Sequence, residues 1–396
     1  MKIVHIEDFF HPDAGYQLNI LAKNMARLGH EITIICAEMD KIPERLIAFF
    51  GREDIEKRDR HYSQKYGVKI VRLPLIAFVS GRAVFHHDLF RAIRQENPDV
   101  VYIHGNDTLT AMRYLLNINK MRYPLVMDNH MLEMASVNSF SLAFRKVYKK
   151  LFASIIIKYN VPVIRTQDDP YVEKCLGIPL VQAPLISFGS DTMLFHPDDS
   201  VRKKFRVENG IASEAFVVLY AGKLDESKGA HLLADALLEK IPVYKEIVFV
   251  IVGNTSGEYG EKIEQKLQNS QNRILRFETQ KYENLAYFYQ SVDLALFPRQ
   301  CSLSFFDVQA CGVPVVFEDN NINIDRAAYG SACVFKAGNV SDFRDKIIEM
   351  CNMDGEDYNS MRRKGVEYIR KNYDYTHIIE EYMGLIDQTV RKYAVK

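Results

Sequence analysis

The sequence lacks any apolar run that could cross a membrane. Its longest apolar run, Ala215 to Ala221, is far shorter than the ~20 residues that span a bilayer as a helix. Met1 and Lys2 lead directly into the strand-like residues 3–6, without the pattern of a secretory leader. We therefore expect a protein that is neither secreted by that route nor integral to a membrane, and we predict a cytoplasmic location.

Cysteine is scarce and scattered. The spacing of the six cysteines fits neither a metal site nor a disulfide scaffold, so free thiols in a reducing compartment are expected. They stand at positions 36, 175, 301, 311, 333 and 351.

An excess of charge of one sign is also absent. Lys and Arg number 51, and Asp and Glu also number 51, so the composition gives no reason to expect nucleic acid as a partner. Basic residues predominate in 1–190 and acidic residues in the rest. Within the first part, residues 141–157 form a basic amphipathic helix that can lie peripherally on an anionic membrane, at its inner face. The alternative is a solvated charged face over an ordinary core stripe.

What the sequence does contain is a repeated alternation of β-rich and helix-periodic segments. At 396 residues, the chain is too long for one ordinary core and fits two domains. The alternation predicts an α/β protein with two Rossmann-like, doubly wound parallel sheets that face each other across a cleft.

The expected elements follow from this alternation. In the first half, strands are predicted at 2–6, 31–36, 68–73, 99–103, 125–127, 162–165 and 180–183, and helices at 17–28, 85–94, 108–116, 141–157 and 170–175. In the second half, strands are predicted at 216–220, 247–252, 274–277, 294–297 and 313–317, and helices at 230–238, 258–267, 284–291, 342–350, 359–371 and 376–392.

The stretch 297–318, FPRQCSLSFFDVQACGVPVVFE, reads as strand, loop, helix, turn and buried strand. Ser302 is predicted to cap the helix, and the backbone N–H groups of Leu303 and Ser304 to bind an anion such as a phosphate. Asp307 follows ~7 Å further along the helix axis, within reach of the hydroxyls of an attached sugar.

The run DVQACGVPVV resembles the EAMACGVPVV segment of the retaining, nucleotide-sugar-dependent glycosyltransferases of family 4, which have the GT-B fold. In that family two glutamates bracket this loop, the first facing the donor sugar and the second holding the nucleotide ribose. The resemblance matches the second glutamate to Asp307. Arg299 stands at the position of the first glutamate, so this acid is absent from the sequence. Its absence leaves the identity of the donor sugar open.

The resemblance extends over nearly the whole chain. The loop PDAGYQ, with Gly15, resembles the family's PxxGG loop, in which small residues let a ligand approach; Gly15 can also be a simple turn glycine. Residues 186–197 resemble the interdomain connector, which implies an acceptor-side domain at 1–190, a nucleotide-sugar domain at 191–375, and a last helix (376–396) packing back onto the first. The charged insert 39–66 is interpreted as an acceptor-side element.

A second charged loop, AGKLDESKG, resembles the family's GRLxxxKG motif and contains Lys223 and Lys228. Two ammonium groups at a helix N-terminus can stabilise a departing diphosphate without a metal, so no metal and no cofactor is predicted. The alternative is a surface turn rich in charge. Gly253, after the next strand, occupies a position that contacts the nucleotide in the family.

His130 follows a predicted parallel strand, where the family has a histidine that reaches the donor sugar. Local capping or packing is the alternative for a lone histidine. His86, His87 and His104 are interpreted as structural or surface residues.

Together these features predict a retaining glycosyltransferase that moves a sugar from a UDP- or GDP-linked donor to a sugar or lipid-linked acceptor hydroxyl, in polysaccharide or glycolipid synthesis. The candidate catalytic residues are Lys223, Lys228 and His130. The alternatives are a non-catalytic sugar-nucleotide-binding or partner subunit, and an epimerase or phosphorylase of the same fold. No carboxylate pair with glycoside-hydrolase spacing can be identified.

Overall fold

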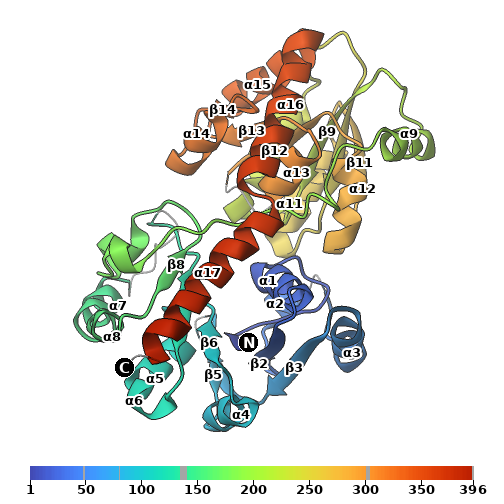
Figure 1. Ribbon diagram of the computed structural model, residues 1–396. Helices are drawn as coiled ribbons and strands as arrows, with labels where there is room; N and C mark the ends of the chain where they lie inside the picture. The colour runs from blue at the N-terminus through green and yellow to red at the C-terminus, as the bar shows by residue number, and fades with distance from the viewer. Residues whose placement is uncertain (48–49, 80, 134–140, 300–303, 395–396) are drawn as a thin grey trace. The chain divides into compact units, whose positions relative to one another are not determined.

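The structure is a computed structural model that describes the chain except for residues 48–49, 80, 134–140, 300–303 and 395–396. The chain divides into two compact units (Figure 1). The first comprises Met1–Phe188 with Thr376–Lys396, and the second comprises Gly189–Tyr375. No helix among the described residues combines the length and the apolar character required to cross a membrane.

The first unit contains a six-stranded parallel sheet with the order β3-β2-β1-β6-β7-β8. Its strands are β1 (Lys2–Glu7), β2 (Glu31–Ala37), β3 (Val68–Leu73), β6 (Val100–Ile103), β7 (Leu125–Asn129) and β8 (Val163–Arg165). An antiparallel hairpin, β4 (Leu75–Val79) and β5 (Arg82–Phe85), follows β3.

Helices accompany this sheet. They are α1 (Gln17–Arg27), α2 (Glu44–Ile47), α3 (Ile55–Tyr66), α4 (Asp88–Glu96), α5 (Leu109–Leu116), α6 (Ile118–Met121), α7 (Ser141–Tyr148) and α8 (Ser154–Tyr159). A π-helical turn, Lys149–Ala153, joins α7 to α8. The long C-terminal helix α17 (Tyr375–Ala394), red in Figure 1, contributes Tyr382 to this unit, where its hydroxyl accepts a hydrogen bond from Gln17 at 2.6 Å.

The second unit repeats the arrangement, with the parallel order β11-β10-β9-β12-β13-β14. Its strands are β9 (Phe216–Ala221), β10 (Ile247–Val252), β11 (Arg273–Phe277), β12 (Leu294–Phe297), β13 (Val315–Glu318) and β14 (Ala332–Phe335). Its helices are α9 (Asp199–Glu208), α10 (Ala230–Leu238), α11 (Gly257–Gln268), α12 (Leu285–Tyr289), α13 (Ser304–Ala310), α14 (Asn321–Ala327), α15 (Val340–Asn352) and α16 (Gly355–Asn372).

The central strands of the second sheet, β9, β10 and β12, are apolar runs because both faces of the sheet are covered. Every residue of β10 is buried, as is every residue of β12. Parallel strands that are covered on both faces appear in the sequence as continuous apolar runs. Such runs are the signal that located these strands.

Three local predictions are wrong. Residues 180–183 do not form a strand: Leu180–Gln182 is a 3₁₀ turn, and Val181 is 90% exposed, so this apolar run has no sheet to join. Residue Phe85 ends strand β5, and the predicted helix 85–94 begins only at Asp88. The segment 170–175 is a short π-helical turn, Tyr171–Cys175, instead of an α-helix.

Candidate active site

The strand order places a switch point in each sheet. At a switch point, the connections that follow two neighbouring strands run toward opposite ends of the sheet. Ligands of open α/β sheets bind beyond the carboxyl ends of those two strands. In the second unit the two strands are β9 and β12. The loop 222–229 follows β9, and the chain from Pro298 follows β12. The lysine loop therefore meets Pro298 and Arg299 at one edge of this sheet.

The loop that carries Lys223 and Lys228 is held by its own hydrogen bonds. The hydroxyl of Tyr220 donates to the carbonyl of Lys223 at 2.6 Å, and the side chain of Asp225 accepts from the backbone N–H of Lys228 at 3.0 Å. Asp225 thereby caps the short helical turn that precedes α10. Both lysine side chains are half-buried. These hydrogen bonds thus fix the backbone of both lysines just before α10, whose positive dipole end lies at the same place.

Arg299 links this loop to the chain after β12. Its guanidinium donates to the carbonyl of Glu226 at 3.0 Å. A Cβ added at Gly229 would lie 3.0 Å from the Cβ of Arg299, so the two backbones are packed closely. The residue that stands in place of the family's first acid therefore has a structural contact that the sequence did not reveal.

Gly253 follows β10 and lies against the same loop. Its φ is +139°, and a Cβ added to it would lie 1.9 Å from the carbonyl oxygen of Gly222. Only glycine allows this approach. The side chain of Asn254 accepts from the backbone N–H of Thr279 at 3.1 Å, which ties the β10 loop to the β11 loop. A hollow of about 470 Å³ opens beside these strands, lined in part by Asn254, Arg276 and Glu278.

Asp307 lies in the first turns of α13 and is only 2% exposed. Its Oδ1 accepts hydrogen bonds from Ser190 Oγ at 2.7 Å and from Tyr282 OH at 3.3 Å. Asp307 therefore ties the connector segment to α13. The two partners, Ser190 and Asp307, lie more than a hundred positions apart in the sequence, and sequence reasoning did not predict their contact. Ser304 is the first residue of α13. Ser302 and Leu303 lie outside the described residues.

In the first unit, Gly15 lies in the loop between β1 and α1. The turn is formed by a hydrogen bond from the backbone N–H of Ala14 to the carbonyl of His11 at 3.1 Å. Arg58 of α3 pairs with Asp13 at 2.9 Å, so the charged insert is attached to this loop. The insert therefore belongs to the carboxyl edge of the first sheet.

His130 comes directly after β7, at the same edge, and its side chain is 37% exposed. Its Nδ1 lies 3.1 Å from Thr166 Oγ1, and its Nε2 lies 3.2 Å from Asp128 Oδ1. The ring stacks on Phe188 with centroids 5.5 Å apart. Three neighbours therefore fix the orientation of the imidazole.

Asp128 is the centre of a buried polar chain that sequence reasoning missed. His104 Nδ1 lies 2.7 Å from its Oδ2, and His104 Nε2 lies 3.0 Å from His5 Nδ1. Burial by itself would raise the pKa of Asp128, but His130 and His104 outweigh burial and hold that pKa well below its ordinary value. Burial, with His104 beside it, holds the pKa of His5 well below its ordinary value. Asp128 is therefore ionised beneath His130.

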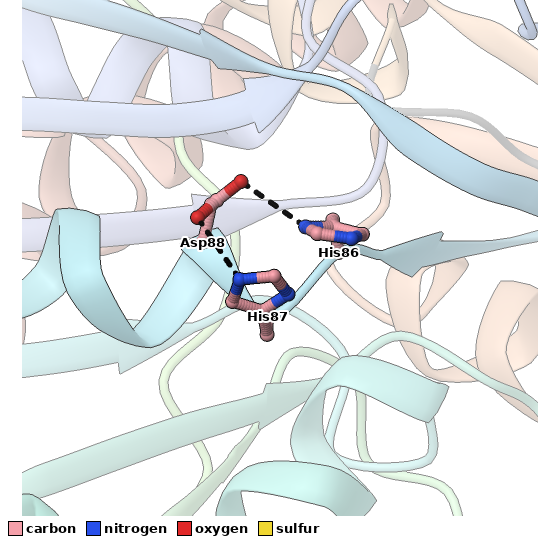
Figure 2. A group of neighbouring side chains, drawn as sticks. All are labelled: His86, His87 and Asp88. Atoms are coloured by element: carbon pink, nitrogen blue, oxygen red, sulfur yellow. Dashed lines mark hydrogen bonds and ion pairs between the residues drawn. The ribbon is translucent and has the colours of Figure 1, made fainter.

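Two groups of side chains among the described residues have the composition and spacing to hold a metal ion: His104 with Asp128 and His130, and His86 with His87 and Asp88. In the first group Asp128 and His104 are buried, and His104 continues the hydrogen bonding to His5, so we interpret this group as a buried hydrogen-bonded chain. The second group lies at the start of α4 (Figure 2).

Comparison with known families assigns the class. Residues 201–371 match the family described as glycosyl transferases group 1, and residues 15–162 match the family described as glycosyltransferase family 4. Together the matches span most of the chain. The protein therefore belongs to the group 1 glycosyltransferases, a class of enzymes, and its two parallel-sheet units have the GT-B fold.

The relatives are distant. A D-inositol 3-phosphate glycosyltransferase of Catenulispora acidiphila is 30% identical over an alignment that covers 32% of this chain and 33% of the relative, so the match spans about a third of that protein. A glycosyltransferase structure from Rickettsia africae has a TM-score of 0.76 at 13% identity, with 98% of each chain covered. HepE of Anabaena, in complex with UDP and glucose, has a TM-score of 0.74 at 17% identity, covering 98% of this chain and 100% of HepE. The structural likenesses establish the fold.

Proposed function

We propose that the protein transfers a sugar from a UDP- or GDP-linked donor to an acceptor hydroxyl with retention, in polysaccharide or glycolipid synthesis. The observation that carries the proposal is the switch point of the second sheet, where the lysine loop after β9 packs against Pro298 and Arg299 after β12. The structure of Anabaena HepE with UDP and glucose supports a nucleotide-sugar donor, and the name of the Catenulispora relative supports glycosyl transfer.

In the proposed reaction, the bond between the anomeric carbon and the diphosphate oxygen breaks, and its electron pair stays on the leaving diphosphate. The acceptor oxygen attacks from the same face, and its proton passes to the leaving phosphate oxygen. Lys223 and Lys228 stabilise the negative charge that grows on the diphosphate, because fixed cations in a half-buried site cost little reorganisation. Lysine supplies charge here without the bidentate geometry of arginine.

The remaining candidates have binding roles in this proposal. Gly253 lets the nucleotide approach the backbone of the β10 loop, and Gly15 does the same for the donor in the first unit. Asp307 binds a ribose hydroxyl that takes the place of Tyr282 OH, the longer of its two hydrogen bonds at 3.3 Å. Ser304, with Ser302 and Leu303, binds phosphate. His130 differs from these: it is the third candidate catalytic residue and reaches both the donor sugar and the reaction centre.

A binding subunit without catalytic activity is the second candidate. It is favoured by Arg299, which occupies the position of the family's first acid and is engaged with Glu226. The two candidates differ in turnover: a transferase releases free nucleotide when donor and acceptor are supplied together, whereas a binding subunit retains the donor unchanged.

We expect UDP or GDP to stabilise the protein in the absence of metal, since the proposed site uses lysines and no cofactor. A ligand that binds only the folded state raises the free energy of unfolding by ~2.7 kcal/mol at a hundredfold excess over its dissociation constant. A thermal-shift series with UDP, GDP and AMP, each with and without EDTA, measures this. A shift that EDTA abolishes would contradict the lysine-based site.

We further propose that the helical segment 141–157 contacts an anionic membrane. Among its residues Leu142, Val147 and Leu151 are 68%, 57% and 43% exposed, which is unusual for a helix face that only meets water. Exposed lysines at 146, 149 and 150 accompany them. Exposed apolar side chains among lysines suit an interface with anionic headgroups.

Reversing the charge of Lys146, Lys149 and Lys150 to glutamate should weaken binding to phosphatidylglycerol vesicles roughly 100-fold, since each basic residue contributes about 1 kcal/mol. Co-sedimentation measures the partition. The control reverses Lys57, Arg60 and Lys65 on α3, which are also exposed. Equal losses in both triple variants would mean that overall charge, and not this helix, governs adsorption.

A further inference from the structure

Three consecutive side chains at the start of α4 bring two imidazoles and a carboxylate together. His86 Nδ1 lies 3.1 Å from Asp88 Oδ2, and His87 Nε2 lies 3.5 Å from Asp88 Oδ1. Figure 2 shows each histidine facing a different oxygen of the same carboxylate. The ligand atoms of the three residues, one from each, all lie within 4.8 Å of one another. Metal–ligand bonds of ~2.0–2.1 Å in tetrahedral geometry put neighbouring ligand atoms about 3.3 Å apart, so small rotations of the side chains would bring them around one ion.

The backbone beneath this group is fixed. The guanidinium of Arg113 donates to the carbonyl of Phe85 at 2.6 Å and to that of His86 at 3.4 Å. The backbone N–H of Leu89 donates to the same His86 carbonyl at 3.3 Å, which closes the first turn. An ion that binds here would order two exposed imidazole rings and little else, which keeps the entropic cost of binding low.

The carboxylate of Asp88 is suited to a cation. Its Oδ1 is shielded from water and accepts no hydrogen bond, although Arg91 NH1 is near at 3.2 Å. The His86 and His87 side chains are 45% and 64% exposed, so an ion can reach them from solvent.

We propose that His86, His87 and Asp88 form a binding site for a late first-row divalent cation such as Zn²⁺, Ni²⁺ or Co²⁺. Imidazole nitrogens with one carboxylate favour these ions over Mg²⁺ and Ca²⁺, which prefer all-oxygen sites. The ion takes the lone pair of each ring nitrogen, so the hydrogen that His86 directs at Asp88 moves to Nε2 or is released. Affinity therefore falls as pH decreases through the histidine range. This site requires no sugar nucleotide and stands apart from the proposed function.

Titration calorimetry of the full chain with Zn²⁺ alone, after EDTA treatment and dialysis, tests the proposal. The double variant His86→Ala/His87→Ala should lose affinity at least ~10-fold, and Asp88→Asn, which keeps the shape of the side chain, should do the same. His61→Ala removes an exposed histidine from α3 and should bind as the wild type does. Arg91→Ala should bind as tightly as the wild type or more tightly, because it removes a competing cation.

Two results would overturn the site. One is a double variant that keeps wild-type Zn²⁺ affinity; the other is weaker binding by Arg91→Ala. Co²⁺ absorption separates this site from the cysteines: ligand-field bands without thiolate charge transfer are expected, and a thiolate band that survives the double variant would assign the metal to a cysteine.

Discussion

Replacing Lys228 with alanine should lower the rate of donor turnover by ~10²-fold, which corresponds to about 2.7 kcal/mol of lost transition-state stabilisation. The lost ammonium acts mainly on charge that develops as the diphosphate leaves, so the rate constant should fall more than donor affinity. Lys223→Ala should show the same pattern. The fold should persist, because Asp225 caps the loop through the backbone N–H of residue 228, which alanine retains.

Release of nucleotide from the donor that gives the largest thermal shift is the measurement. Lys228→Arg keeps the charge and should recover part of the rate, whereas Lys262→Ala, an exposed lysine of α11 in the same unit, should leave it unchanged. A Lys228→Ala enzyme with full rate would exclude this residue from the reaction.

The fold was predictable where strands are covered on both faces. The apolar runs that became β9, β10 and β12 contain no polar residue, and such runs have few alternatives to a buried parallel strand. The strand prediction failed where apolar residues are exposed instead of buried. Leu180–Gln182 has residues typical of a strand, but after Pro179 it forms an exposed 3₁₀ turn. The hairpin β4–β5 was missed because its turn has no Asn-Gly or Asp-Gly signal and its strands are half-exposed.

The candidate site was predictable only in part. The loops could be placed because they follow strands and resemble a family pattern. The hydrogen bonds that support these loops could not be predicted, because they join residues that are far apart in the sequence and become neighbours only through the strand order. His5, His104 and Asp128 belong to β1, β6 and β7 or their ends, and they meet because those strands are neighbours. The pairing of Ser190 with Asp307 arises in the same way.

Gly253→Ala should be the most disruptive single change at the proposed donor site. The added Cβ would lie 1.9 Å from the carbonyl oxygen of Gly222, so one of two backbones must move. Backbone strain and overpacking each cost about 1–3 kcal/mol, and we expect the free energy of unfolding to fall by ~2–5 kcal/mol. Because Gly222 begins the lysine loop, its displacement should also weaken nucleotide binding by at least ~10-fold.

Gly257→Ala is the matched control, since Gly257 lies four residues further along the same loop region, also has positive φ (+63°), and has open space where a Cβ would be. It should cost only the ~1–2 kcal/mol of a left-handed conformation and leave nucleotide affinity unchanged. Urea unfolding and the thermal-shift series with UDP and GDP measure both effects. If Gly253→Ala bound nucleotide as tightly as Gly257→Ala does, the contact between the β9 and β10 loops would have no part in the donor site, and the lysine loop would have to act independently of its neighbour.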